Sequence, residues 1–159
     1  MVKFILKDDC VIGITTKGEY FLIDIIDYDI VKQYNWYIGK RGYLVSEKCH
    51  KHYILHRIIM KPSSNELVDH INHILTDNRR CNLRICNKSQ NMMNQKKTRG
   101  TSKYKGVCWD KVKHKWLAQI DTKFIGYFDI EEKAAEAYNT KAKELFGEFA
   151  YLNKIEGDN

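Results

Sequence analysis

The segment from Leu67 to Asn94 constrains the fold most, because short apolar runs in it alternate with a long polar loop. Its first run contains Asp69 and His70, and polar residues 72–80 follow. Residues 83–86 (LRIC) then have the pattern of a short return strand. Neighbouring residues on a strand point to opposite faces, so Asp69 and His70 can serve one site only where the strand ends in a loop or twist. The polar loop supplies such a place.

A short helix is expected directly after this return strand. Asn87 and Gln90 stand in the register of a capping box, so the helix should begin at Asn87. Asn91 then falls in its first turn, at the positive end that favours a phosphate. Asp69 and Asn91 form an oxygen-only ligand set, which favours Mg²⁺ or Mn²⁺ over zinc. Metal-assisted phosphodiester hydrolysis needs such a cation, a base for water, and a scaffold that fixes both.

The net charge of +7 is concentrated in residues 96–123. This block holds nine basic residues against two acidic ones, which accounts for the whole excess. A solvated basic face would not normally gather the entire excess of a chain, so the block predicts a surface that binds a polyanion. Its basic residues are Lys96, Lys97, Arg99, Lys103, Lys105, Lys111, Lys113, Lys115 and Lys123.

The composition also argues against several classes of protein. No apolar run approaches the ~18–20 residues that span a bilayer, and no basic, apolar leader opens the chain. We therefore expect a cytoplasmic protein with no membrane partner. Five cysteines are an odd number without a CxxC pair, which argues against a disulfide framework and a zinc knuckle.

The first fifty residues are predicted to be a β-rich scaffold. Two apolar runs, 11–15 and 19–24, flank Lys17-Gly18 as a hairpin, and a second hairpin is expected around residues 39–42. A short helix over 27–34 separates them. The expected elements after them are a strand over 52–55 and a helix over 56–60, which Pro62 ends.

Several motifs in this half occur together and in order. They are His56-Arg57, Val68-Asp69-His70-Ile71-Asn72, Asp77-Asn78-Arg79, Asn82-Leu83-Arg84 and Gln90-Asn91. In this combination the chain resembles the HNH endonucleases, particularly the phage and intron-encoded homing type. The resemblance implies a ββα-metal fold in which Asp69 and Asn91 hold the divalent cation and His70 is the general base. It also implies that Asn82 ties the loop together and orients that histidine.

Positions near the motif leave alternatives open. His73 and Ile74 stand where the family commonly has Gly and Asn, and a non-Gly residue there can strain the turn. His73 either faces solvent from the loop or joins the site. His56 and Arg57 either contact phosphate, or His56 is a hydrogen-bonded histidine of the scaffold.

Three short strands and one helix are predicted in the second half, over residues 103–109, 115–121, 124–128 and 130–146. The strands carry the basic excess, whereas residues 129–159 contain eight acids against four lysines. The sheet is therefore expected to face the polyanion, with the helix behind it. The residues expected on the inward stripe of the helix are Ala134, Ala135, Tyr138, Ala142 and Leu145.

This half resembles the DNA-binding domain of the Apetala-two/ethylene-response-factor family. The matching residues are Tyr104-Lys105-Gly106-Val107, Lys115-Trp116, Ala118, Ile120, Ile125-Gly126, Phe128, Glu132, Ala134-Ala135, Ala137-Tyr138, Phe146-Gly147 and Leu152-Asn153. The resemblance implies that the sheet lies in the major groove of duplex DNA. The DNA contacts that it implies are Lys105, Cys108, Trp109, Lys115, Gln119, Asp121 and Phe124. Trp116 is expected in the core, because Trp109 and Trp116 are assigned to opposite faces of the sheet.

The sequence thus predicts an α+β protein. A β-rich scaffold with an HNH ββα-metal domain spans residues 1–95 (motif 56–95), and a DNA-binding domain with a three-stranded antiparallel sheet packed on one helix spans 103–153. A basic linker over 96–102, whose Lys96, Lys97 and Arg99 are further DNA contacts, joins them, and 154–159 form a tail.

The predicted function is a sequence-directed, homing-type endonuclease that nicks double-stranded DNA with one Mg²⁺ or Mn²⁺, with a monomer favoured. The alternatives are a DNA-binding regulatory protein with an inactive HNH scaffold, and an RNA-binding protein.

Overall fold

The computed structural model describes residues 1–96 and 99–155 of the chain. Lys97, a predicted DNA contact, and residues 156–159 of the predicted tail lie outside the described residues. Within the described part, eleven strands form four small sheets and four α-helices accompany them, which confirms the α+β prediction. None of the helices described there is long and apolar enough to cross a membrane.

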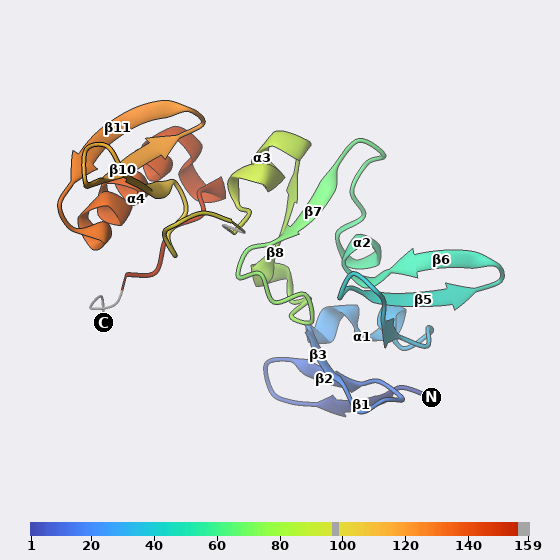
Figure 1. Cartoon of the computed structure of the whole chain (residues 1–159). Helices are drawn as coiled ribbons and strands as arrows, with labels where there is room; N and C mark the ends of the chain where they lie inside the picture. Colours follow the sequence, from blue (N-terminus) through green and yellow to red (C-terminus); the bar gives the residue numbers. More distant parts are fainter. Residues whose placement is uncertain (97–98, 156–159) are drawn as a thin grey trace. The chain divides into compact units, whose positions relative to one another are not determined.

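The chain divides into two compact units, Met1–Lys88 and Ser89–Asn159. The division falls at the start of helix α3 (Lys88–Met93), before the predicted end of the first domain at residue 95. The finer predicted segmentation into nuclease domain, linker and DNA-binding domain stays a prediction. Figure 1 gives the course of the chain through both units.

The first unit opens with the antiparallel sheet β1-β2-β3. Its central and last strands, β2 (Val11–Ile14) and β3 (Tyr20–Ile23), form the predicted hairpin, with Gly18 at φ +84° in the turn. Strand β1 (Lys3–Leu6) was not predicted. Most of its side chains are exposed, and its sequence does not show the alternation of apolar and polar residues that marks a half-buried strand.

The predicted helix over 27–34 is shorter than expected. A 3₁₀ turn (Ile25–Asp27) leads into α1 (Tyr28–Val31). The helix ends there because the buried Trp36 indole donates a hydrogen bond of 2.9 Å to the Val31 carbonyl oxygen, which a longer helix would use itself.

The second sheet has the order β4-β5-β6, with β4 at Tyr37–Ile38, β5 at Leu44–Lys48 and β6 at Lys51–Ile54. Helix α2 (Leu55–Met60) follows directly and ends before Pro62, with Lys61 in the left-handed region at φ +49°. The second predicted hairpin and the predicted short helix are thereby confirmed.

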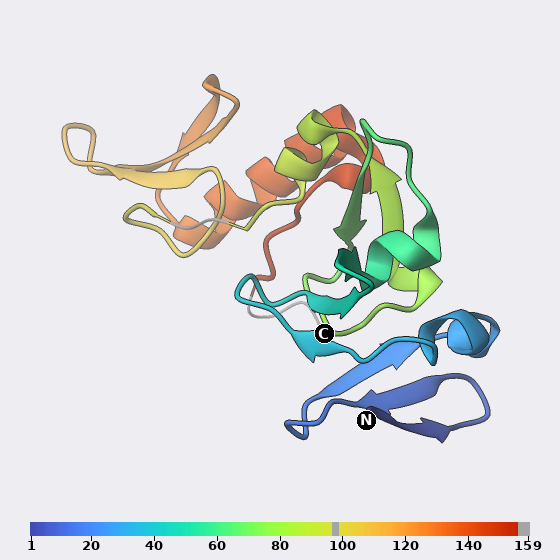
Figure 2. The same cartoon turned by 90° about the vertical axis from the view of Figure 1, so that its right-hand side faces the viewer.

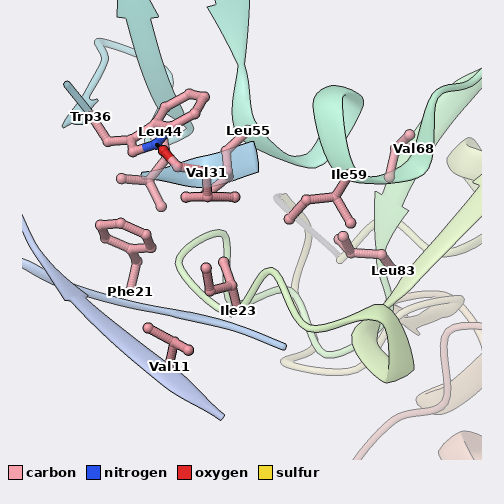
Figure 3. Packing of buried hydrophobic residues seen from close by; sticks show 10 residues of the cluster. All are labelled: Val11, Phe21, Ile23, Val31, Trp36, Leu44, Leu55, Ile59, Val68 and Leu83. Carbon is pink, nitrogen blue, oxygen red and sulfur yellow. Dashed lines mark hydrogen bonds between the residues drawn. The ribbon is translucent and has the colours of Figure 1, made fainter. Parts of the chain in front are cut away.

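Strands β7 (Leu67–His70) and β8 (Leu83–Cys86) pair antiparallel, with Asp69 opposite Arg84 and His70 opposite Leu83. One hydrophobic core joins this pair to both sheets and to the helices of the unit. Figure 3 shows ten of its side chains, which are Val11, Phe21, Ile23, Val31, Trp36, Leu44, Leu55, Ile59, Val68 and Leu83.

A pair of backbone hydrogen bonds attaches the β7–β8 loop to the outer edge of β3. The Leu22 amide donates to the Thr76 carbonyl, and the Asn78 amide donates to the Leu22 carbonyl, each at 2.8 Å. The two bonds form a parallel bridge between Leu22 and Asp77. The loop thus pairs with the edge of the first sheet in the way that a short additional strand would.

The second unit contains the antiparallel sheet β11-β10-β9 and helix α4 (Glu131–Phe146), which lies along one face of that sheet (Figures 1 and 2). The strands are β9 (Val107–Asp110), β10 (Lys115–Ile120) and β11 (Lys123–Phe128). Of the predicted inward stripe of α4, Leu145 is 46% exposed and does not belong to the core, whereas the other four residues are buried.

Strand β9 begins at Val107, four residues later than predicted. Gly106 has a φ of +74°, and its Cα lies so close to the Tyr138 ring that an added Cβ would clash with it. The chain therefore turns at Gly106 before the strand can start.

The prediction that Trp109 and Trp116 face opposite sides of the sheet is wrong. The two are direct partners across β9 and β10, so they share a face, and their rings are 5.1 Å apart. Trp116 packs against the core under α4, as expected, and Trp109 follows it to the same side.

Candidate active site

Asp69 and His70 are the last two residues of β7, at the point where the strand gives way to the polar loop. Both side chains belong to buried residues, with 8% and 3% exposure. The strand thus ends where the sequence argument requires. What the two side chains can do depends on the groups around them.

The Asp69 carboxylate is held by Arg84 from the paired strand. Arg84 Nη2 and Nε both bind Oδ2 of Asp69, at 2.7 and 3.0 Å. Each side chain is only 10% exposed, so water screens this ion pair weakly. Arg84 therefore fixes the orientation of a buried carboxylate, and a cation bound there would share it with the guanidinium.

The buried Asn82 closes the loop that follows His70. Its Oδ1 accepts from the Asn72 amide at 2.9 Å, and its Nδ2 donates to the Asp77 carbonyl at 2.8 Å. Asn72 adds a turn of its own, because its Oδ1 accepts from the Ile74 amide at 2.8 Å. The two asparagines thus hold both arms of the loop together.

Two aspartate–arginine pairs fix the loop further. Arg79 Nε and Nη2 bind the two oxygens of Asp77 at 2.8 Å each, and this guanidinium lowers the pKa of the Asp77 carboxyl. Arg80 binds both oxygens of Asp27, at 2.9 and 2.7 Å, while its backbone amide donates to Asp24 Oδ2 at 2.7 Å. The second pair ties the loop to the scaffold more than fifty residues earlier.

The His70 ring contacts Asn78 and the rings of two other residues. Its Nε2 is 3.3 Å from Asn78 Oδ1, and its ring centroid is 5.1 Å from that of His56 and 6.1 Å from that of Tyr43. Burial lowers the pKa of His70. The imidazole is therefore neutral near pH 7, which is the state that can accept a proton.

His56 is 7% exposed on α2, and burial lowers its pKa to about 3. Its ring packs edge-on against His70 and 5.0 Å from the Tyr43 ring. These contacts favour the scaffold histidine among the two alternatives. Arg57 donates from Nη1 to the Glu66 carbonyl at 3.1 Å. A phosphate contact by either residue stays a prediction.

His73 stands where the HNH endonucleases that the chain resembles commonly have Gly. Its φ of +62° lies in the left-handed region. Its amide donates to the His70 carbonyl at 3.0 Å, which makes a tight turn at the end of β7. Ile74 after it is 54% exposed. The strained turn expected from these two departures is therefore present in the structure.

Asn91, the second predicted metal ligand, lies on α3 in the second unit, whereas Asp69 and His70 lie in the first. Two groups of the second unit cap this helix at its last carbonyl, that of Met93: Lys105 Nζ donates at 2.7 Å and the Tyr151 amide at 3.3 Å. A cation is favourable at a helix C-terminus. Lys105, predicted to contact DNA, thus binds the chain's own backbone, and burial lowers its pKa.

The face of the sheet away from α4 carries four of the predicted DNA contacts, which are Cys108, Lys115, Gln119 and Phe124. Leu117 and Tyr127, opposite each other on β10 and β11, lie on the same face and were missed by the sequence analysis. The alternation of β10 could have identified Leu117, but Tyr127 depends on the bulge in β11. Asp121 lies in the turn between these strands at φ +45°, and Lys96 and Arg99 are exposed.

The donor chemistry fits a hard divalent cation. Asp69 offers a carboxylate and Asn91 an amide oxygen, and both types suit Mg²⁺ or Mn²⁺. Among residues 1–96 and 99–155 no group of three or more His, Cys, Asp or Glu is arranged to hold a metal. A cation at Asp69 would have coordination positions left for oxygens of water and phosphate.

Comparison with known proteins gives one informative relative. An uncharacterized HNH endonuclease of Acanthamoeba polyphaga mimivirus is 34% identical over 145 residues, which cover 88% of this chain and 78% of that protein. No model of a protein family matches the sequence, and no solved structure matches it.

Replacing Asp77 by Asn tests the ionic support of the loop. The change removes the charge that binds Arg79, so we expect the free energy of unfolding at pH 7 to fall by about 2 kcal/mol. The folded-state pKa of Asp77 is lowered, so its contribution is complete above the unfolded pKa of about 3.9 and disappears as the pH falls through the folded value. The difference between the two proteins should therefore shrink below about pH 4.

Urea unfolding across this pH range measures the effect of Asp77→Asn. Asp29→Asn is the matched control, because the Asp29 side chain in its pair with Lys32 is 85% exposed. A difference that does not change with pH, or an equal effect in the control, would show that the Asp77 pair does not support the loop.

Two substitutions of His73 separate backbone strain from any role of the imidazole. Both His73→Gly and His73→Ala remove the ring, but only Gly relieves the left-handed conformation. We expect the Gly variant to be more stable than the Ala variant by about 1 kcal/mol, measured by urea unfolding. An endonuclease assay of the two variants would decide between the alternatives for His73: activity like that of wild type assigns it to the loop, and activity lost in both assigns it to the site.

Proposed function

Because the chain belongs to the HNH endonuclease family, we propose that it is a DNA endonuclease of homing type that hydrolyses phosphodiester bonds with one Mg²⁺ or Mn²⁺. The carrying observation is at the end of β7. There His70, whose pKa is lowered by burial, directly follows Asp69, whose carboxylate is fixed by Arg84. A neutral base next to a hard anionic ligand is the arrangement that metal-assisted hydrolysis needs.

In the proposed reaction His70 takes a proton from the water that attacks the scissile phosphate. Asp69 and Asn91 would hold the cation, and Arg84 keeps the Asp69 carboxylate oriented. When bound, a divalent cation supplies stabilisation of the negative charge on the phosphate and on the leaving oxygen. Asn82 keeps the loop closed behind His70.

Affinity for DNA is assigned mainly to the second unit, in which the sheet β9–β11 acts as the Apetala-two-like module. Its open face combines Lys115 and Gln119 with the aromatic rings of Phe124 and Tyr127, which are 5.2 Å apart. Lysine is a point charge without the fork of arginine, so such a face is suited to phosphates and to the apolar parts of bases. Lys96 and Arg99, which are exposed, would add phosphate contacts.

One base per chain favours a nick as the product of a monomer. A break in both strands would require two chains or two visits to the DNA. The proposal therefore predicts relaxed circles before linear molecules when a supercoiled plasmid is the substrate.

A nicking assay tests the proposed function. Supercoiled plasmids from a library of random DNA fragments are incubated with Mg²⁺ and with wild type, His70→Ala or His50→Ala. His50 is an exposed histidine in the β5–β6 turn and serves as the matched control. We expect wild type and His50→Ala to nick the same fragments, and His70→Ala to be slower by about 10²–10⁴-fold, the usual contribution of a general base. DNA affinity, measured by mobility shift, should not change.

Other outcomes would favour the alternatives. Tight DNA binding without a nick by wild type, on any fragment, indicates a DNA-binding regulatory protein. Equal competition by structured RNA and by duplex DNA indicates an RNA-binding protein.

A further inference from the structure

We infer that Asn78 is the positioning residue for His70 and that it fixes the imidazole as the Nε2–H tautomer, which leaves Nδ1 as the nitrogen that accepts the proton. The role as a base rests on the proposed function, but the tautomer does not. The family resemblance implied this positioning role for Asn82 instead. The two asparagines can be compared contact by contact.

The orientation of the Asn78 amide is determined by its own contacts. The residue is 1% exposed, and its Nδ2 lies 3.2 Å from the Leu75 carbonyl oxygen, which can only accept. The NH₂ group must therefore face Leu75. This places Oδ1 on the side of His70, 3.3 Å from Nε2.

The tautomer of His70 follows from this orientation. An amide oxygen cannot donate, so the nitrogen that faces it has to carry the hydrogen. A neutral imidazole has one N–H, and with the hydrogen on Nε2 the lone pair is on Nδ1. Asn78 thus determines which edge of the ring is basic.

The Asn82 side chain makes its hydrogen bonds to the loop. Its Oδ1 accepts from Asn72 and its Nδ2 donates to the Asp77 carbonyl, so both ends of its amide serve the loop. It acts on His70 only through the course of the backbone. The structure therefore separates the two tasks, with loop closure at Asn82 and orientation of the base at Asn78.

The backbone of Asn78 is as firmly held as its side chain. Its amide donates to the Leu22 carbonyl at 2.8 Å, which attaches it to the edge of β3. The neighbouring Asp77 is bound by Arg79. The oxygen that faces His70 therefore has little freedom to move, which is what a positioning group requires.

Nitrogen NMR of the histidine rings tests the tautomer directly. Full-length protein labelled with ¹⁵N-histidine is compared as wild type, Asn78→Leu, Asn78→Asp and Asn82→Ala at pH 7.5 without metal, and the His70 signals are assigned by their loss in His70→Ala. Asn78→Leu keeps the volume without an acceptor, whereas Asn78→Asp keeps an acceptor. We expect protonated Nε2 and unprotonated Nδ1 in wild type, in Asn78→Asp and in Asn82→Ala, and averaged shifts of the two nitrogens in Asn78→Leu.

A wild-type spectrum with the hydrogen on Nδ1 would overturn the inference, and so would an unchanged tautomer in a folded Asn78→Leu. If Asn78→Leu does not fold, Asn78→Ala, which also lacks the acceptor, takes its place with the same expected result. Nicking adds a second readout. The maximal rate of Asn78→Leu should fall on the order of 10–100-fold with unchanged DNA affinity, and Asn78→Asp should recover most of it. The expected spectra without any nicking by wild type would refute the proposed function and leave the positioning role intact.

Discussion

The position of the loop around the candidate site depends on two backbone hydrogen bonds at Leu22. They join the outer edge of β3 to Thr76 and Asn78 in the loop that follows the candidate base. Loops normally move more than the elements that they connect. Here the loop is paired like a strand, so the side chains that surround His70 inherit the rigidity of the first sheet and of the core below it.

Arginine–aspartate pairs provide the second constraint. Arg79 and Arg80 each bind both oxygens of an aspartate, and Arg84 binds Asp69 through two nitrogens. The planar guanidinium presents its donors in a rigid fork, which the rotatable ammonium of lysine lacks, so each pair fixes a direction as well as a distance. The basic residues of this region therefore serve the fold, and the proposed grip on DNA depends more on the lysines of the second unit.

Local sequence patterns predicted most helices and strands, but they could not predict contacts between residues that are far apart in the sequence. Gly18, Pro62 and Gly147 have backbone preferences that act within a few residues, so they correctly marked the turn of the first hairpin and the ends of α2 and α4. The contact of Asn78 with His70 and the tie of Arg80 to Asp27 depend on the path of the folded loop, which no spacing in the sequence encodes. The shared face of Trp109 and Trp116 depends on strand register, and the turn at Gly106 moved the start of that strand.

Residue-resolved hydrogen exchange of the amides of Leu22 and Asn78 tests most directly whether the loop is a rigid extension of the sheet. We expect both amides to exchange as slowly as the paired amides of β2 and β3 and with the same dependence on denaturant. The reason is that the loop and the sheet open in the same unfolding event. Exchange of Asn78 as fast as that of Lys40, an exposed residue in the β4–β5 turn, would contradict it. The base would then lie on a mobile loop, and the fixed orientation of His70 would be lost with it.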